Sequence, residues 1–168
     1  MKNLIILSLI PLLIGCKAFQ KEIIISKDII QSALDSKFPY NKSMLLARVE
    51  LKEPTIYFKN TNVGINLKYW ANFLEKEIEG TVDLNGHIRY EKGSFYMDSL
   101  ELKEISMNEK EFSSEGKLRK ILINLIKNYL ECFPVYKLKQ SDFKQSVAKL
   151  LLRDITVEGD NLKVTVGL

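Results

Sequence analysis

Two long segments of alternating sequence constrain the fold of this chain more than any other feature. In "NVGINLKYWANF", residues 62–73, every second residue from Val63 to Phe73 is apolar. In "EIEGTVDLNGHIRY", residues 77–90, every second residue from Ile78 to Tyr90 is apolar or glycine. A period of two places such side chains on one face of a β-strand. We therefore expect two strands far longer than the usual roughly 5–6 residues.

The second segment contains Asn85 and Gly86, a pair that alone favours a hairpin turn. We prefer one unbroken strand, because the alternation continues through the pair. Gly80 and Gly86 then lie on the inner face, where the strand bends or something packs close. Their missing side chains would also leave room beside a helix on that face. The better hairpin turn is "EKGS" at residues 91–94.

Shorter patterns complete an α+β protein, in which a block of antiparallel strands has helices on either side. Further strands are expected at residues 22–26, 47–58, 95–107 and 133–138, and a terminal hairpin at 153–168 turns at 158–161. Helices are expected at residues 26–39, 114–133 and 141–152. Because long sheets twist strongly, we expect a strongly curled antiparallel sheet wrapped around one amphipathic helix, with additional short helices.

Single residues mark the expected ends and irregularities of these elements. Ser26 is a candidate N-cap of the first helix, and Pro39 stops that helix. Pro54 indicates a sheet edge or a bulge. Shifts in the apolar phase near Ser99 and Glu104 predict bulges in the strand that contains them.

The helix at residues 114–133 carries a wide apolar stripe with helical spacing. Such a stripe on a sheet is ordinarily part of a solid core. The alternative is that it lines a cavity for an apolar molecule. On that interpretation the candidate ligand-facing residues are Leu118, Ile121, Leu122, Leu125, Ile126 and Tyr129.

The N-terminus follows a different pattern. Lys2 precedes an almost continuous apolar run from Leu4 to Ile14. The run is too short for a membrane span, which needs about 20 residues, and it fits a signal peptide. The residues around Gly15 and Cys16, "LIGC", resemble the lipobox of bacterial lipoproteins. We expect residues 1–15 to be a lipoprotein signal peptide, with cleavage between Gly15 and Cys16.

The lipobox resemblance implies a covalent anchor on Cys16. That residue would carry a diacylglyceryl group and an N-acyl chain, which together suffice for stable attachment. Residues 16–21 would form a lipidated tether, and residues 22–168 a single α+β domain. In enteric-type lipoproteins an aspartate directly after the lipidated cysteine favours retention in the inner membrane. This chain has Lys17 there, so the resemblance implies sorting to the inner leaflet of the outer membrane, where the protein would face the periplasm. Cys132 would then be unpaired, and we expect it to pack as a small hydrophobe.

The composition argues against several other classes of function. The net charge of +4 comes from lysines that alternate with glutamates, which does not favour nucleic-acid binding. The single histidine, His87, falls on the outward phase of its strand. No nucleophile elbow, phosphate-binding loop or metal-ligand spacing is present. We expect no catalytic residue, no metal site and no cofactor besides the covalent lipid.

The whole mature chain resembles the YceB-like lipoproteins of Gram-negative bacteria. The resemblance rests on the lipobox, on "SKDIIQSALDSKFP", on "GHIRYEKGSFYMDSLEL", on "LINLIKNYLECFPVYKL" and on the apolar C-terminal hairpin. It implies a relative of the tubular lipid-binding fold, in which a curled sheet wraps a long helix around an apolar cavity. It also implies binding of a lipid or another apolar ligand, and no known reaction.

Two functions therefore remain open. The first is a membrane-anchored module that binds a lipid or other hydrophobic ligand between helix and sheet. The second is a non-enzymatic envelope interaction or scaffold protein with a solid core. Its partner would dock on exposed aromatic residues, for which Tyr57, Trp70 and Tyr96 are candidates.

Overall fold

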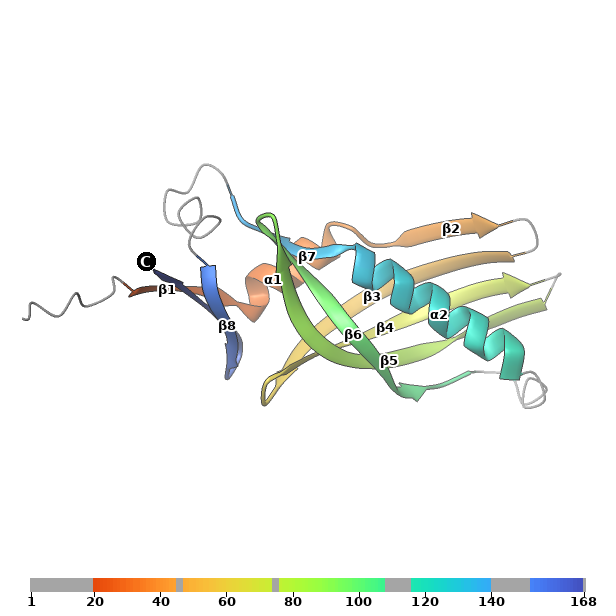
Figure 1. The fold of residues 1–168 in the computed structure, drawn as a ribbon. Coiled ribbons are helices and arrows are strands. Elements are labelled where there is room, and N and C mark those ends of the chain that lie inside the picture. Colours follow the sequence, from red (N-terminus) through yellow and green to blue (C-terminus); the bar gives the residue numbers. More distant parts are fainter. Residues whose placement is uncertain (1–19, 45–46, 74–75, 108–115, 140–151, 168) are drawn as a thin grey trace, which may run out of the picture.

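The computed structural model describes residues 20–44, 47–73, 76–107, 116–139 and 152–167 (Figure 1). These residues form two antiparallel sheets and two helices, an α+β fold. In chain order the elements are β1 (Gln20–Ser26), α1 (Lys27–Asp35), β2 (Tyr40–Met44), β3 (Ala47–Lys59), β4 (Asn62–Phe73), β5 (Lys76–Glu91), β6 (Ser94–Ile105), α2 (Gly116–Cys132), β7 (Pro134–Lys137), β8 (Leu152–Glu158) and β9 (Asn161–Gly167).

The larger sheet has six strands in the order β2-β3-β4-β5-β6-β7 and curls like a half-barrel (Figure 1). The two long alternating segments are β4 and β5, as the sequence predicts. The strand β5 runs without interruption through Asn85 and Gly86, which pair with β4. The turn falls between Glu91 and Ser94, the last pair of the β5–β6 hairpin. The alternation was therefore a better guide than the local turn signal.

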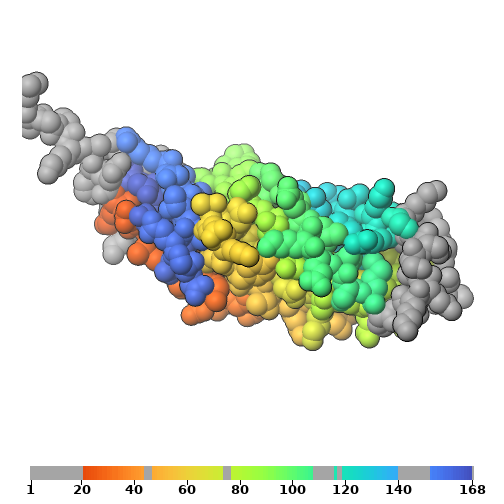
Figure 2. Space-filling model, turned by 90° about the horizontal axis from the view of Figure 1, so that it is seen from below, coloured from red at the N-terminus to blue at the C-terminus, as the bar shows by residue number. Residues whose placement is uncertain are grey.

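The smaller sheet has three strands in the order β1-β9-β8. It contains the expected C-terminal hairpin, in which Glu158 pairs with Asn161. Its apolar face contributes Ile25, Leu162 and Val164 to the hydrophobic core. The molecule is elongated, with the small sheet towards one end and α2 towards the other (Figure 2).

Three predicted irregularities in the large sheet are confirmed as bulges. The register of β3 against β4 shifts between Lys52 and Thr55, around Pro54, and Glu53 has a φ of 51°. In β6 the register shifts near Ser99, which has a φ of 53°. A third shift lies in β6 just before Glu104, also as expected. Each bulge bends its strand and increases the local twist.

The glycines of β5 allow close approach of β6 and leave no space beside a helix. A Cβ on Gly80 would lie 2.0 Å from the carbonyl oxygen of Ser106, which follows β6. A Cβ on Gly86 would lie 2.4 Å from the carbonyl oxygen of Asp98. The expectation of free space was wrong, because the neighbouring backbone fills it. The expectation that something packs close to these glycines is confirmed.

The helix α1 is shorter than predicted. It ends at Asp35, before Pro39, and Ser26 makes no capping hydrogen bond with its side chain. Instead, Gln31 ties the helix to β3. Its amide nitrogen donates to the Pro54 carbonyl at 2.6 Å, and its amide oxygen accepts from the Ile56 N–H at 2.9 Å. These bonds satisfy backbone groups at the bulge.

The strand β2 has no counterpart in the sequence-based prediction. Its sequence "YNKSM" lacks apolar alternation, because β2 is an edge strand that pairs only with β3 among the described residues. The predicted helix at residues 141–152 lies outside the described residues, except that Leu152 begins β8. The predicted signal peptide and most of the tether also lie outside them.

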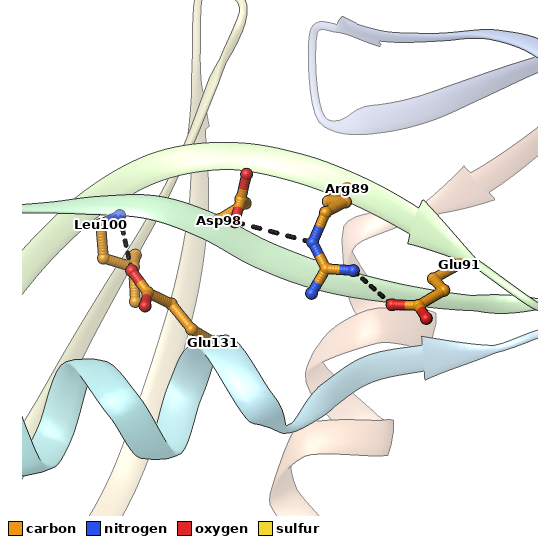
Figure 3. A network of polar contacts seen from close by, with 5 residues as sticks. All are labelled: Arg89, Glu91, Asp98, Leu100 and Glu131. Atoms are coloured by element: carbon orange, nitrogen blue, oxygen red, sulfur yellow. Dashed lines mark hydrogen bonds and ion pairs between the residues drawn. The ribbon is translucent and has the colours of Figure 1, made fainter.

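The helix α2 packs against the sheet through one side. Its residues Leu122, Ile126 and Leu130 belong to the same core cluster as the inner-face residues of the sheet. The carboxylate of Glu131 accepts a hydrogen bond at 3.1 Å from the N–H of Leu100 in β6 (Figure 3). This bond occupies a backbone donor beside the Ser99 bulge, so it fixes the helix against that strand.

A separate polar cluster lies on the outer face of the β5–β6 hairpin (Figure 3). The guanidinium of Arg89 lies 2.6 Å from Glu91 and 3.6 Å from Asp98. Its centre also lies 4.8 Å from the ring of Tyr96. Exposed ion pairs of this kind contribute little to stability, because water and salt screen them.

Replacing Gly86 with alanine should destabilise the fold. The added methyl would meet the Asp98 carbonyl, and overpacking of this kind costs about 1–3 kcal/mol. Urea unfolding should therefore show a lower midpoint for Gly86→Ala. The control is Gly116→Ala, because a Cβ on Gly116 meets nothing within 4 Å. Equal midpoints for the two variants would contradict the close approach of β5 and β6.

Alanine substitutions in α2 should distinguish its buried side from its exposed side by their effect on the free energy of unfolding. Leu122 is 1% exposed, so Leu122→Ala should lower the free energy of unfolding by about 2–5 kcal/mol. Ile121 is 49% exposed, so Ile121→Ala should change it by about 0.5 kcal/mol or less. Chemical denaturation of both variants measures the difference, and a larger loss for Ile121→Ala would show that the helix packs in another orientation.

Candidate ligand-binding groove

A groove of about 550 Å³ runs between α2 and the edge strand β2. Its lining comprises Tyr40, Lys42, Ile121, Asn124, Leu125, Asn128, Tyr129 and Cys132. Most of the surface exposed in the groove is apolar. The polar groups of the lining are two amides, one ammonium, one thiol and two tyrosine hydroxyls. The groove is thus an apolar channel with a few polar groups.

Helix and strand periodicity together explain the lining. Ile121, Leu125, Asn128 and Cys132 follow one another at intervals of three and four residues, so they share one side of α2. On β2, Tyr40 and Lys42 are two residues apart and share one face. Lys42 pairs with buried Val49, which places the lysine on the apolar inner face of the sheet.

The candidate residues of the apolar stripe divide between the groove and the core. Ile121, Leu125 and Tyr129 line the groove. Leu122 and Ile126 instead face the core, where they are 1% and 0% exposed. The side chain of Leu118 lies outside the described residues. The sequence signal was one broad stripe, and only the position of β2 shows where that stripe divides.

An aromatic cluster around Tyr129 joins the helix α2 to β2 and to the segment between α1 and β2. The ring of Tyr129 stacks on Tyr40, with centroids 3.6 Å apart and planes 17° from parallel. Phe133 stacks on it at 5.4 Å, and Phe38 meets it edge-on at 6.1 Å. Burial, and to a lesser degree Tyr40, raises the pKa of Tyr129 to about 12. Its hydroxyl therefore stays protonated and uncharged beside the groove at neutral pH.

Cys132 is exposed and lines the groove, so the expectation that it packs in the core was wrong. The cause is its position on the helix, since it lies eleven residues after Ile121 and therefore three turns along the same side. The apolar neighbours in the sequence suggested burial. The helical spacing from Ile121 was the signal that could have placed it correctly.

The groove has little charge compared with the other hollows of the described surface. Among the described residues that line it, Lys42 is the one side chain with a formal charge, and none is a carboxylate. A hollow of about 470 Å³ beside β3, β4 and β5 instead contains two lysines and two glutamates. In it Lys68 and Glu53 form an ion pair at 2.5 Å. The groove is therefore the better candidate for an apolar ligand.

The aromatic residues considered as docking anchors are all half-buried. The hydroxyl of Tyr57 donates to Asp83 at 2.6 Å, and burial followed by this contact raises its pKa. Tyr96 is covered by the guanidinium of Arg89. Trp70 lies in β4, where it is in register with Glu50 of β3 and Glu79 of β5. Contacts within the protein thus hold Tyr57 and Tyr96, which leaves them less surface for a partner.

Other chemical candidates add little within the described residues. His87 is exposed on β5, in agreement with its predicted outward phase. No group of three or more His, Cys, Asp or Glu side chains comes together among these residues. None of their helices has the length and apolar character needed to cross a membrane. Gly15 and Cys16 lie outside the described part of the chain.

Comparison with known proteins identifies a family without assigning a function. The family model described as "Protein of unknown function (DUF1439)" matches residues 25–161. No curated protein is similar enough to count as a match. The family description names no lipoprotein and no ligand, so the likeness to YceB-like lipoproteins stays a prediction. The match runs from the end of β1 to the start of β9, and the chain therefore belongs to this family of unknown function.

Proposed function

We propose that this protein is a periplasm-facing, lipid-anchored lipoprotein that binds a lipid or another hydrophobic molecule in the α2–β2 groove. The observation that carries the proposal is the apolar groove itself. Its volume of about 550 Å³ lies within the range of about 300–1,000 Å³ that is typical of ligand pockets. Its few polar groups fit the pattern of ligand sites, in which isolated polar contacts orient an apolar molecule.

Exposed apolar surface in the groove supports the proposal. Ile121 is 49% exposed, whereas most large apolar side chains of the described residues are buried or partly buried. A bound aliphatic chain would cover Ile121 and Leu125 and remove this surface from water, which is favourable in proportion to the area covered. The Tyr40–Tyr129 stack would supply a rigid apolar wall beside them.

The curl of the sheet explains where in the fold the ligand would bind. We propose that the sheet and α2 together form the tubular arrangement that the sequence resemblance implies, with the sheet wrapped around the helix. The groove then lies at the seam where the edge strand β2 meets α2. A ligand could enter along this seam without separating the core residues Leu122 and Ile126 from the sheet.

Anchoring would hold the domain near a membrane. The proposed lipid on Cys16 precedes the start of β1 at Gln20 by four residues. A chain of that length extends at most about 14 Å. The domain would therefore stay close to the inner leaflet of the outer membrane, which is a source of apolar ligands.

A charged residue in the groove should prevent ligand binding. In Ile121→Glu the new carboxylate would lie among apolar side chains, and covering it with an apolar ligand would be unfavourable. Native mass spectrometry of the purified protein should show bound lipid for the unchanged protein and its loss in this variant. The control is Ile29→Glu on α1, since Ile29 is exposed to a similar extent, 47%.

Two results would count against a ligand in the groove. One is unchanged protein that carries no apolar molecule and takes up no apolar dye. The other is equal lipid loss in both variants. The first result would favour the envelope scaffold, in which the core is solid and the surface docks a protein partner.

Removing the proposed lipid acceptor should release the protein from the outer membrane. In Cys16→Ser no thioether can form, so cell fractionation should move the protein out of the outer-membrane fraction. Cys132→Ser is the control, because it removes the other of the two cysteines. A Cys16→Ser protein that still fractionates with the outer membrane would contradict the lipid anchor.

A further inference from the structure

We propose that the ligand of the groove is an amphiphile with an anionic headgroup, and that Lys42 binds this headgroup. The inference rests on the proposed function, since it requires that the groove binds a ligand. It adds the charge of the ligand and the residue that recognises it.

The position of Lys42 carries the inference. Lys42 lies on the inner face of β2, in register with Val49, and Val49 is in turn in register with Ala71 in β4. Both neighbours are 0% exposed, so this row of the inner face is apolar up to the lysine. A charged side chain in such a row would ordinarily be unfavourable. Here it borders the groove.

Charge complementarity determines the sign of the ligand. The described part of the groove lining contains the ammonium of Lys42 and no carboxylate. No ion pair joins Lys42 to another side chain of the described residues. The amides of Asn124 and Asn128, which also line the groove, can donate further hydrogen bonds to an oxygen anion. An anion such as a carboxylate or a phosphate therefore matches the polar groups that are present.

The remaining lining defines the apolar part of the ligand. Ile121, Leu125 and the stacked rings of Tyr40 and Tyr129 supply a surface for an aliphatic chain. An aliphatic molecule with one anionic end would cover this surface and place its headgroup on Lys42. A neutral apolar molecule would leave the ammonium partly covered and unpaired, which is unfavourable.

A protective role is the main alternative for the lysine. Inward-pointing charges on edge strands discourage pairing with another chain, and β2 is an edge strand. That role needs only a charge on β2. It predicts that Lys42→Met promotes self-association and leaves ligand preference unchanged.

Photo-crosslinking can test the preference for an anion. The full-length protein is placed in vesicles of uncharged phosphatidylcholine with diazirine-bearing hexadecanoate, hexadecyl phosphate or hexadecanol. Mass spectrometry then measures the yield of each probe on α2 and β2. Comparing the anion-to-alcohol ratio between protein variants in the same vesicles cancels differences in probe partitioning.

The expected result is a loss of preference in one variant. Lys42→Met keeps the apolar stem and removes the charge, so the ratio should fall by about fivefold, the value for an ion pair of about 1 kcal/mol. Lys42→Arg should restore it. Lys137→Met on β7, the opposite edge strand, should leave it unchanged. Raising the salt concentration should lower the ratio in the unchanged protein and not in Lys42→Met.

The outcomes separate the two proposals. All three probes could crosslink to the groove with an anion-to-alcohol ratio that is the same in Lys42→Met as in the unchanged protein. That result would overturn the anionic ligand and leave the groove as an apolar site. No crosslink from any probe would overturn the proposed function. If one anionic probe alone loses its preference in Lys42→Met, the proposal stands and the headgroup is identified as a carboxylate or a phosphate.

Discussion

The close approach of β6 to β5 is the constraint on which the rest of the structure depends. At Gly80 and Gly86 the neighbouring backbone occupies the space that a side chain would need. The oxygen of Ser106 also accepts a hydrogen bond from the Tyr69 hydroxyl at 2.9 Å. These contacts, with the bulges in β6, curl the long strands. The curl brings their apolar faces together around one core, against which α2 packs.

The curl also positions the groove. The helix is joined to β6 through Glu131 and to β2 through the Tyr129–Tyr40 stack. Since β2 is one edge of the large sheet and β6 lies next to the other edge, the helix bridges the two sides of the sheet. Its core side is filled by Leu122 and Ile126. Among the described elements, the short edge strand β2 lines the groove on its neighbouring side, which carries Ile121. The short length of β2, five residues, leaves an apolar side of the helix partly open.

Much of the fold could be predicted because its signals are local and repeated. The alternation in β4 and β5 predicted two long strands and overruled the turn signal at Asn85. Pro54 and the phase shifts near Ser99 marked real bulges, since each interrupts a period of two. The edge strand β2 was missed because its residues lack that period. Cys132 was misplaced because its sequence neighbours are apolar although its own side of the helix faces the groove.

The sequence by itself determined the long strands, their apolar face and the amphipathic character of α2, because each is a pattern of adjacent residues. The proposed anchor rests on another such pattern, the resemblance of the residues around Cys16 to a lipobox. Only the tertiary structure decided how the helical stripe divides, with Leu122 in the core and Ile121 in the groove. It also decided that Lys42 of β2 would lie across from α2, on an otherwise apolar face. Those facts depend on which strand packs beside the helix, and packing between distant segments leaves no periodic signal in the chain.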